Sequence, residues 1–291
     1  MTVLDDRTAV APPTPLPALP DRRRRRRTAL GRVARMTRFE LTMIFRQKVA
    51  LMSILLAPAT AIGIASFTKP VDDAAWLSLL SSMAVLVLIL AVYTTTTSTV
   101  VSRRENQVLK RFRTSELLPR QMLFSLAAPY VLVGIGQVVV LTAAYQAMGA
   151  PSVARPELFA LVVVATTVMS VLAGFATGTM TANSERVQFG VMPIMMTGLV
   201  TSIMVLNPGL SDNVRGLVLL APYASSSDLA ARALGAPADT FATPAVVVDL
   251  AERLDVSASL LMTGANSLLL AFWCLVFVQV ARSKWRWEPR G

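Results

Sequence analysis

The sequence lacks histidine and contains a single cysteine, Cys274, among its 291 residues. A disulfide framework needs paired cysteines, and structural zinc sites are built from cysteine and histidine, so the inventory excludes both. The sequence also lacks the G-x-x-x-x-G-K-[S/T] pattern of a P-loop. We therefore expect no metal or cofactor in this chain and no ATP site of the P-loop type.

Acidic residues are scarce in the apolar parts of the chain. The 17 Asp and Glu residues lie between or outside the long apolar runs. Intramembrane proton relays need ionisable side chains inside the bilayer, and a hydrolase there would need a pair of acidic residues. This distribution argues against a proton-driven transporter and against a membrane-embedded enzyme, so we expect no catalytic residues.

Long apolar runs dominate what the sequence does contain. Hydrophobic residues make up 54% of the chain and charged residues 15%, and the mean hydropathy is +0.57, which is unlike a soluble domain. A helix of about 20 apolar residues crosses the hydrocarbon core of a bilayer. Runs of about this length cover 49–67, 76–101, 122–148, 158–182, 188–206 and 259–281. The sequence therefore predicts an all-α integral membrane protein with six transmembrane helices in residues 49–281.

The N-terminal part of the chain is rich in proline and then in arginine, with six consecutive arginines at Arg22–Arg27. We expect residues 1–28 to be a disordered tail held in the cytoplasm by its charge. Binding of the arginines to anionic lipid or nucleic acid is the alternative. Residues 29–48 place apolar side chains on one helical face and arginines on the other, which predicts an amphipathic helix in the membrane interface.

The distribution of basic residues predicts the orientation of the spans. Most of the 28 Lys and Arg residues lie in the N-terminal region, in the segment 102–121 and in the tail 282–291. Cytoplasmic segments of membrane proteins carry such an excess, so we expect both termini in the cytoplasm. Topology then accounts for most of the net charge of +11, and we expect no nucleic-acid partner.

The segment 207–258, between the last two spans, is predicted to lie on the external side. Its "SSSDLAARALGAP" offers Ser and Asp at a helix start and Gly235 and Pro237 as a stop, and Thr243-Pro244 predicts a second start. We expect short helices that cover the external end of the bundle. They could form a lid or plug, or only a structural cap.

The charged segment between the second and third spans reads "SRRENQVLKRFRTSELLPRQ". Its opening Ser102-Arg103-Arg104-Glu105 has the spacing of a capping box, which predicts that a new helix begins at Ser102. Apolar and basic residues then follow helical spacing up to Pro119. Such a helix could dock into a partner protein, or it could rest on lipid headgroups and only set the topology.

This segment resembles the corresponding stretch of the type-2 permeases of ATP-binding cassette (ABC) exporters. The matching residues are Arg104-Glu105, Leu109, Arg111-Phe112 and Thr114-Ser115. The glycine usual in that family after the Arg-Glu pair is absent, with Gln107 near its position, and the proline comes late, as Pro119. The order of the other predicted elements, from about 29 to 282, agrees with the family.

The resemblance implies that the segment is a cytoplasmic coupling helix, at about 103–114, seated in a groove of a separate ATPase. It implies this contact for Arg104, Glu105, Leu109, Arg111, Phe112 and Arg113. It further implies two ABC ATPase subunits that bind the ATP and Mg²⁺, a second permease subunit of the same or a related kind, and a bacterial cell membrane. Independently of the resemblance, the lack of fixed charges in the predicted spans favours an apolar or amphipathic substrate. A non-transporting scaffold or sensor that binds another cytoplasmic protein through this segment is the alternative.

Two small-residue motifs lie within the predicted spans. The hydroxyls of Thr94, Thr95, Thr97 and Thr99 near the end of the second span could hydrogen-bond to their own helix, or they could line a translocation path. Gly174 and Gly178 form a G-x-x-x-G motif, which permits close helix packing, either within one subunit or between two.

Overall fold

The structure is a computed structural model, and it describes residues 22–46, 48–106, 119–236 and 243–284. The predicted tail before residue 22 therefore lies outside the described residues. So do four of the predicted coupling residues, Leu109, Arg111, Phe112 and Arg113.

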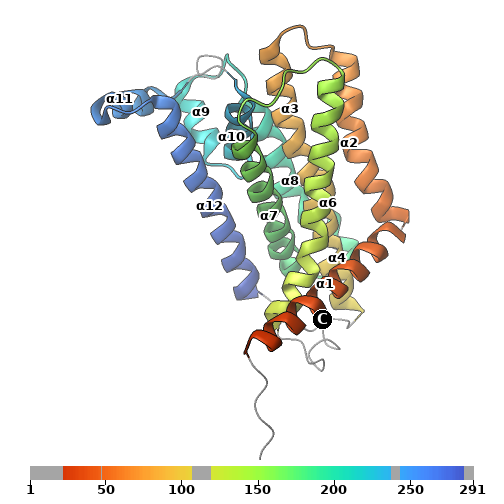
Figure 1. Ribbon diagram of the computed structural model, residues 1–291. Coiled ribbons are helices and arrows are strands. Elements are labelled where there is room, and N and C mark those ends of the chain that lie inside the picture. Colours follow the sequence, from red (N-terminus) through yellow and green to blue (C-terminus); the bar gives the residue numbers. More distant parts are fainter. Residues whose placement is uncertain (1–21, 47, 107–118, 237–242, 285–291) are drawn as a thin grey trace, which may run out of the picture.

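In the described ranges, every regular element is a helix. The order is α1 (Arg22–Arg46), α2 (Lys48–Thr68), α3 (Asp73–Val87), η1 (Leu88–Tyr93), α4 (Thr94–Glu105), α6 (Pro119–Ala147), α7 (Pro156–Met180), η2 (Ser184–Arg186), α8 (Val187–Met204), α9 (Asp212–Leu219), α10 (Ala224–Leu234), α11 (Ala245–Leu254) and α12 (Ala258–Lys284). Long parallel and antiparallel helices form one bundle (Figure 1). This is the predicted all-α integral membrane fold.

Within the described residues, five helical segments are long and apolar enough to cross a bilayer, and they run over Asp73–Glu105, Leu123–Ala147, Pro156–Met180, Ser184–Met204 and Ala258–Lys284. They correspond to predicted spans two to six. The described apolar segment of α2, Ile54–Thr68, is shorter than these. Six spans therefore remain a prediction.

The second span contains a break in its helical geometry that the sequence did not predict. α3, η1 and α4 form one continuous helix, but Leu88–Tyr93 is a π-helix in its middle. The hydroxyl of Tyr93, at the end of this turn, lies 3.1 Å from the Thr177 hydroxyl on α7 and donates to the Val191 carbonyl on α8 at 3.3 Å. π-Helical turns occur often at functional sites, and this one connects span two to two neighbours.

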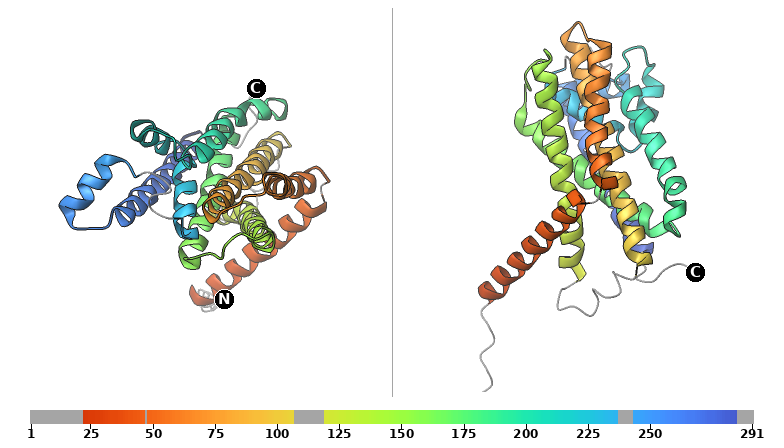
Figure 2. Two further views of the ribbon diagram at one scale, coloured as in Figure 1. Left: turned by 90° about the horizontal axis from the view of Figure 1, so that it is seen from above. Right: turned by 90° about the vertical axis from the view of Figure 1, so that its right-hand side faces the viewer.

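The helix α7 packs in the middle of the bundle. It contacts α4, α6, α8, α10 and α12, and its position is visible in both figures of the fold (Figures 1 and 2). Close packing on α4 depends on Gly174 and Gly178. A Cβ at Gly174 would lie 2.7 Å from the Thr96 Cβ, and one at Gly178 would lie 2.8 Å from the Val100 Cβ. The G-x-x-x-G motif thus serves a contact within one chain.

The N-terminal helix α1 runs obliquely to the spans at one end of the bundle (Figure 2). It packs on α6 and α2. It begins at Arg22 rather than at residue 29, so the arginine run predicted to be disordered is helical; arginine is a good helix former, and the run continues the helix without a break. Glu40 and Ile44 are buried, whereas Phe39 and Phe45 are more than half exposed.

The connection between α8 and α12 forms α9, α10 and α11. The predicted stop at Gly235 is confirmed, because this residue ends α10 in the left-handed conformation with φ 98°. α11 begins at Ala245, with Pro244 as its N-cap residue, so its predicted start is displaced by one position. α10 contacts α3, α7, α8 and α12, and all of its residues are buried. It is inserted into the bundle rather than laid over it.

Buried polar contacts hold this inserted helix in place. Asp228 on α10 accepts a hydrogen bond from the Arg232 Nε at 2.6 Å and another from the Asn266 amide on α12. Arg215 on α9 donates to the Val205 and Asn207 carbonyls, each at 2.7 Å, and so satisfies the end of α8. These contacts fix the position of the α8–α12 connection on the bundle.

Candidate functional site

The candidate site is the last turn of α4, which carries the predicted coupling residues Arg104 and Glu105 and lies directly before the segment 107–118 that carries the other four. We call this end of the bundle the α4 end; α1 and the C-terminal end of α12 lie there too (Figure 1). The predicted capping box is wrong, because Ser102–Glu105 is the final turn of α4 and Asn106 is its C-cap residue. The Ser-x-x-Glu spacing is the same at the end of a helix as at its start.

Three consecutive residues of this turn reach three different elements. Successive residues on a helix point about 100° apart, so neighbours in sequence contact different partners. Arg103 contacts α1, Arg104 contacts the end of α7, and Glu105 contacts η2. We call these three residues the α4 joint.

Arg103 forms a bidentate ion pair with Glu40 on α1. Its Nη1 donates to the Glu40 Oε1 at 2.9 Å, and its Nη2 donates to Oε2. The exposed fractions of the two side chains are 20% for Arg103 and 6% for Glu40. Parallel N–H···O bonds fix orientation as well as distance, so this pair fixes the angle between α1 and α4. Removing one partner of a buried pair costs about 3–5 kcal/mol.

Arg104 satisfies the carbonyl groups at the C-terminal end of α7. Its Nη1 donates to Gly178 at 3.0 Å and to Thr179 at 3.4 Å, and its Nη2 donates to Thr181 and, at 3.0 Å, to Ala182. The last carbonyls of a helix have no partner within it, and they carry partial negative charge. A guanidinium, with several donors in a plane, can satisfy them together. Arg104 is 1% exposed, so in this conformation it offers no surface to another protein.

Glu105 satisfies the start of the next helical segment. The backbone N–H of Ser184 donates to its Oε1 at 2.8 Å, and the Ser184 hydroxyl donates to its Oε2. Ser184 opens η2, which leads directly into α8. A carboxylate at a helix N-terminus is favoured by the helix dipole. Arg104 and Glu105 therefore place opposite charges on the two helix ends that the α7–α8 connection joins.

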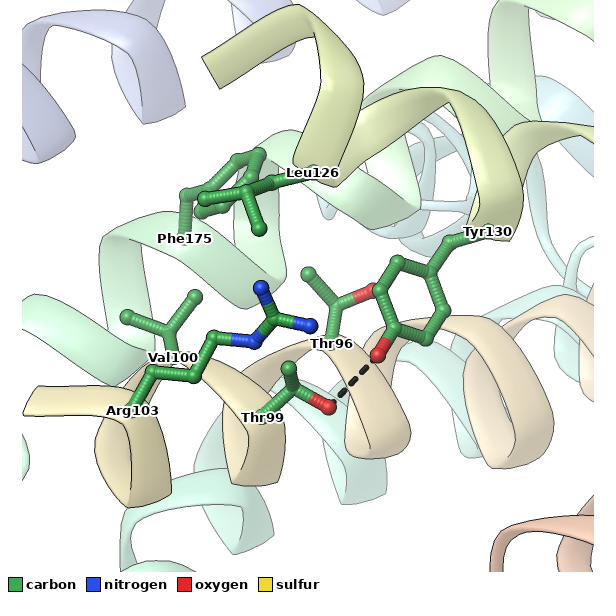
Figure 3. Close-up of a pocket in the computed structure, with 7 residues that line it drawn as sticks. All are labelled: Thr96, Thr99, Val100, Arg103, Leu126, Tyr130 and Phe175. Atoms are coloured by element: carbon green, nitrogen blue, oxygen red, sulfur yellow. Dashed lines mark hydrogen bonds between the residues drawn. The ribbon is translucent and has the colours of Figure 1, made fainter. Parts of the chain in front are cut away.

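A small cavity beside Arg103 shows how closely this region is packed (Figure 3). Its volume is about 10 Å³, and Thr96, Thr99, Tyr130 and Phe175 are among its lining residues. That volume is close to the minimum for one water molecule, so it is too small for a transported molecule. The Thr99 hydroxyl lies 2.6 Å from that of Tyr130 on α6, which ties α4 to a further span.

Three other threonines of the second span, Thr94, Thr95 and Thr97, are bonded to their own helix. Thr94 donates to the Leu90 carbonyl, Thr95 to Ala91, and Thr97 to Tyr93 at 2.9 Å. These bonds are the first of the two roles that the sequence left open. Lining of a translocation path by these threonines remains a prediction.

Sequence reasoning missed Glu40 and Ser184, the residues that pair with Arg103 and Glu105 of the α4 joint. Glu40 is the single acidic residue in α1, and a lone carboxylate in a basic amphipathic helix is the signal that could have indicated a buried partner. Ser184 carries no comparable signal, because it lies 79 residues from Glu105 in a short polar connection.

The comparison with protein families gives a match over most of the chain. The family described as ABC-2 family transporter protein matches residues 33–281, from α1 to the last turn of α12. A comparison with curated proteins finds no match. The chain therefore belongs to the ABC-2 transporter family and is a membrane-spanning permease component of an ABC transporter.

Proposed function

We propose that this chain forms the translocation path of a bacterial ABC exporter and receives its driving force through the α4 end. Two separate ATPase subunits bind ATP and Mg²⁺ and contact the segment 107–118. A second permease subunit, identical or related, completes the path, and the substrate is apolar or amphipathic because the spans carry few charges.

The observation that supports this proposal is the α4 joint. A partner that pushes on the segment 107–118 acts directly on the end of α4. From there Arg103 connects to α1, Arg104 to α7, and Glu105 to η2, which leads into α8. A force applied at one point therefore reaches three further elements through short, charged contacts, and packed helices respond as rigid bodies.

This arrangement changes the role that we assign to two residues. The resemblance implied that Arg104 and Glu105 contact the ATPase, but both are engaged within the chain. We assign them to transmission between helices. Contact with the ATPase then belongs to Leu109, Arg111, Phe112 and Arg113, where apolar side chains fill a groove and charges set the orientation.

The orientation of the protein follows the same reasoning. α1, with its arginines, and the C-terminal end of α12, with Arg282 and Lys284, lie at the α4 end (Figure 1). Clustering of basic residues at one end supports a cytoplasmic location for that end and for both termini.

Cysteine labelling tests this orientation. Cys274 is the only cysteine, so Cys274→Ser gives a background for single-cysteine labelling. Asn106→Cys should be protected from a membrane-impermeant maleimide in intact cells, and Ser257→Cys should be labelled; the reverse pattern would overturn the orientation.

Co-purification tests the partner. The chain is expressed with candidate ABC ATPases, and we expect one of them to purify with it. Phe112→Ala should weaken the complex, whereas Phe272→Ala, which removes a 54% exposed ring from α12, should leave it intact. Retention of the ATPase by the Phe112 variant at wild-type level would contradict the assigned contact. Failure of any ABC ATPase to co-purify would favour the scaffold alternative.

A further inference from the structure

A groove between α6, α7 and α12 has no role in the function proposed above. Its volume is about 670 Å³, within the range of about 300–1,000 Å³ that is typical of small-molecule sites. Phe124 and Ala127 line it from α6, Phe175 from α7 and Val278 from α12. Among the described residues that line it, all except Arg282 are apolar.

The groove opens on the outer surface of the bundle. Phe124 is 70% exposed although it forms part of the wall, so the groove is continuous with the outer surface of the spans. Water in such a groove would find few hydrogen-bond partners. A hydrocarbon chain from the surrounding bilayer has no such penalty, and it can follow a groove that runs between two spans.

The charged residue stands at one end of the groove. Arg282 belongs to the last turn of α12 and is exposed. At the end of a span, a long basic side chain reaches the level of the lipid headgroups. None of the described residues that line the groove is acidic, so no carboxylate of this described wall neutralises the guanidinium. A guanidinium binds a phosphate through paired, charge-assisted hydrogen bonds.

We propose that this groove is a binding site for an anionic phospholipid of the membrane. One acyl chain lies between α6 and α12 against Phe175, and the headgroup phosphate binds Arg282. A hydrocarbon chain gains little free energy by leaving the bilayer for an apolar groove. The charge of Arg282 therefore sets the preference for anionic over uncharged headgroups. One basic residue near an anionic surface corresponds to about 1 kcal/mol, or roughly a fivefold preference.

Lipid competition in nanodiscs tests the selectivity. The chain is reconstituted in equal amounts of phosphatidylglycerol and phosphatidylcholine with identical acyl chains, and the lipid that stays bound on gentle detergent extraction is identified by native mass spectrometry. We expect phosphatidylglycerol to be enriched about fivefold, the preference of one basic residue. Arg282→Ala should abolish the enrichment. Lys284→Ala is the matched control, because it removes an exposed basic residue from the same turn that does not line the groove, and it should keep the enrichment.

Photo-crosslinking tests the position. A phosphatidylglycerol with a diazirine in its acyl chain should label Phe124 and Val278 more than Met196, which lies on the exposed face of α8. The variant Ala127→Phe fills the groove and should remove that difference. Equal labelling of both faces, equal binding of the two lipids, or equal effects of the Arg282 and Lys284 variants would overturn the proposal. Efficient disulfide crosslinking between two chains through Ala127→Cys in the Cys274→Ser background would also overturn it, since a second copy would then fill the groove.

Discussion

Replacing Gly174 by alanine should destabilise the bundle, because α4 and α7 approach each other there without room for a methyl group. The added Cβ would lie 2.7 Å from the Thr96 Cβ and 3.1 Å from the Tyr93 carbonyl oxygen. Carbon atoms in contact are ordinarily about 3.5–4.0 Å apart, so the two helices must separate by about 1 Å. Backbone on one side prevents relief by a side-chain rotation. Overpacking of this kind costs about 1–3 kcal/mol.

Gly264 on α12 is the matched control, because a Cβ there would meet nothing within 4 Å. Gly264→Ala should be neutral or stabilising by up to about 1 kcal/mol, since alanine favours a helix over glycine. The free energy of unfolding of each variant is measured in detergent micelles by denaturant titration and by thermal unfolding. Gly174→Ala should be less stable than wild type, and Gly264→Ala should not. Equal stability of the two variants would refute the packing of α4 on α7.

Further stability predictions use the same measurement. Arg104→Lys keeps the charge but loses the planar set of donors, and it should cost about 1.5–3 kcal/mol for each hydrogen bond lost at the end of α7; wild-type stability would show that those carbonyls do not need the guanidinium. Asp228→Ala leaves Arg232 buried without its carboxylate, at a cost of about 3–5 kcal/mol. Asp249→Ala is the control: it breaks the ion pair with Arg253 on α11, whose side chains are 61% exposed for Asp249 and 73% for Arg253, and it should cost less than about 1 kcal/mol. Equal losses of stability in the Asp228 and Asp249 variants would contradict the burial of α10.

Much of the fold follows from local signals in the sequence. Length and hydropathy locate the five long apolar helical segments, because the bilayer requires about 20 apolar residues for each crossing. Gly235 ends α10 where expected, since a glycine readily takes the left-handed conformation. These features depend on residues close together in the chain.

The features that sequence reasoning missed depend on distant residues. Arg104 is buried because it donates hydrogen bonds to the carbonyls at the end of α7. These carbonyls are close in space but more than 70 positions away in sequence. Charged residues are almost never fully buried unless they are paired, so exposure was the natural expectation for Arg104. The insertion of α10 among four helices has the same cause. Its Ser and Asp residues are typical of a surface helix, and the buried Asp228 carboxylate is compensated by Arg232 and by Asn266 on α12, 38 positions away in sequence.

The most direct test of the account is a charge exchange at the α4 joint. The complex with its ATPase is reconstituted, and the rate of ATP hydrolysis is compared for wild type, Glu40→Arg, Arg103→Glu and the double exchange, with an exchange of Asp249 and Arg253 as control. If the ion pair transmits motion, each single exchange should reduce the effect of the permease on the rate of ATP hydrolysis by roughly tenfold, as expected for directly interacting residues. The double exchange should restore this effect. Single variants that fold, bind the ATPase and retain wild-type coupling would contradict the account.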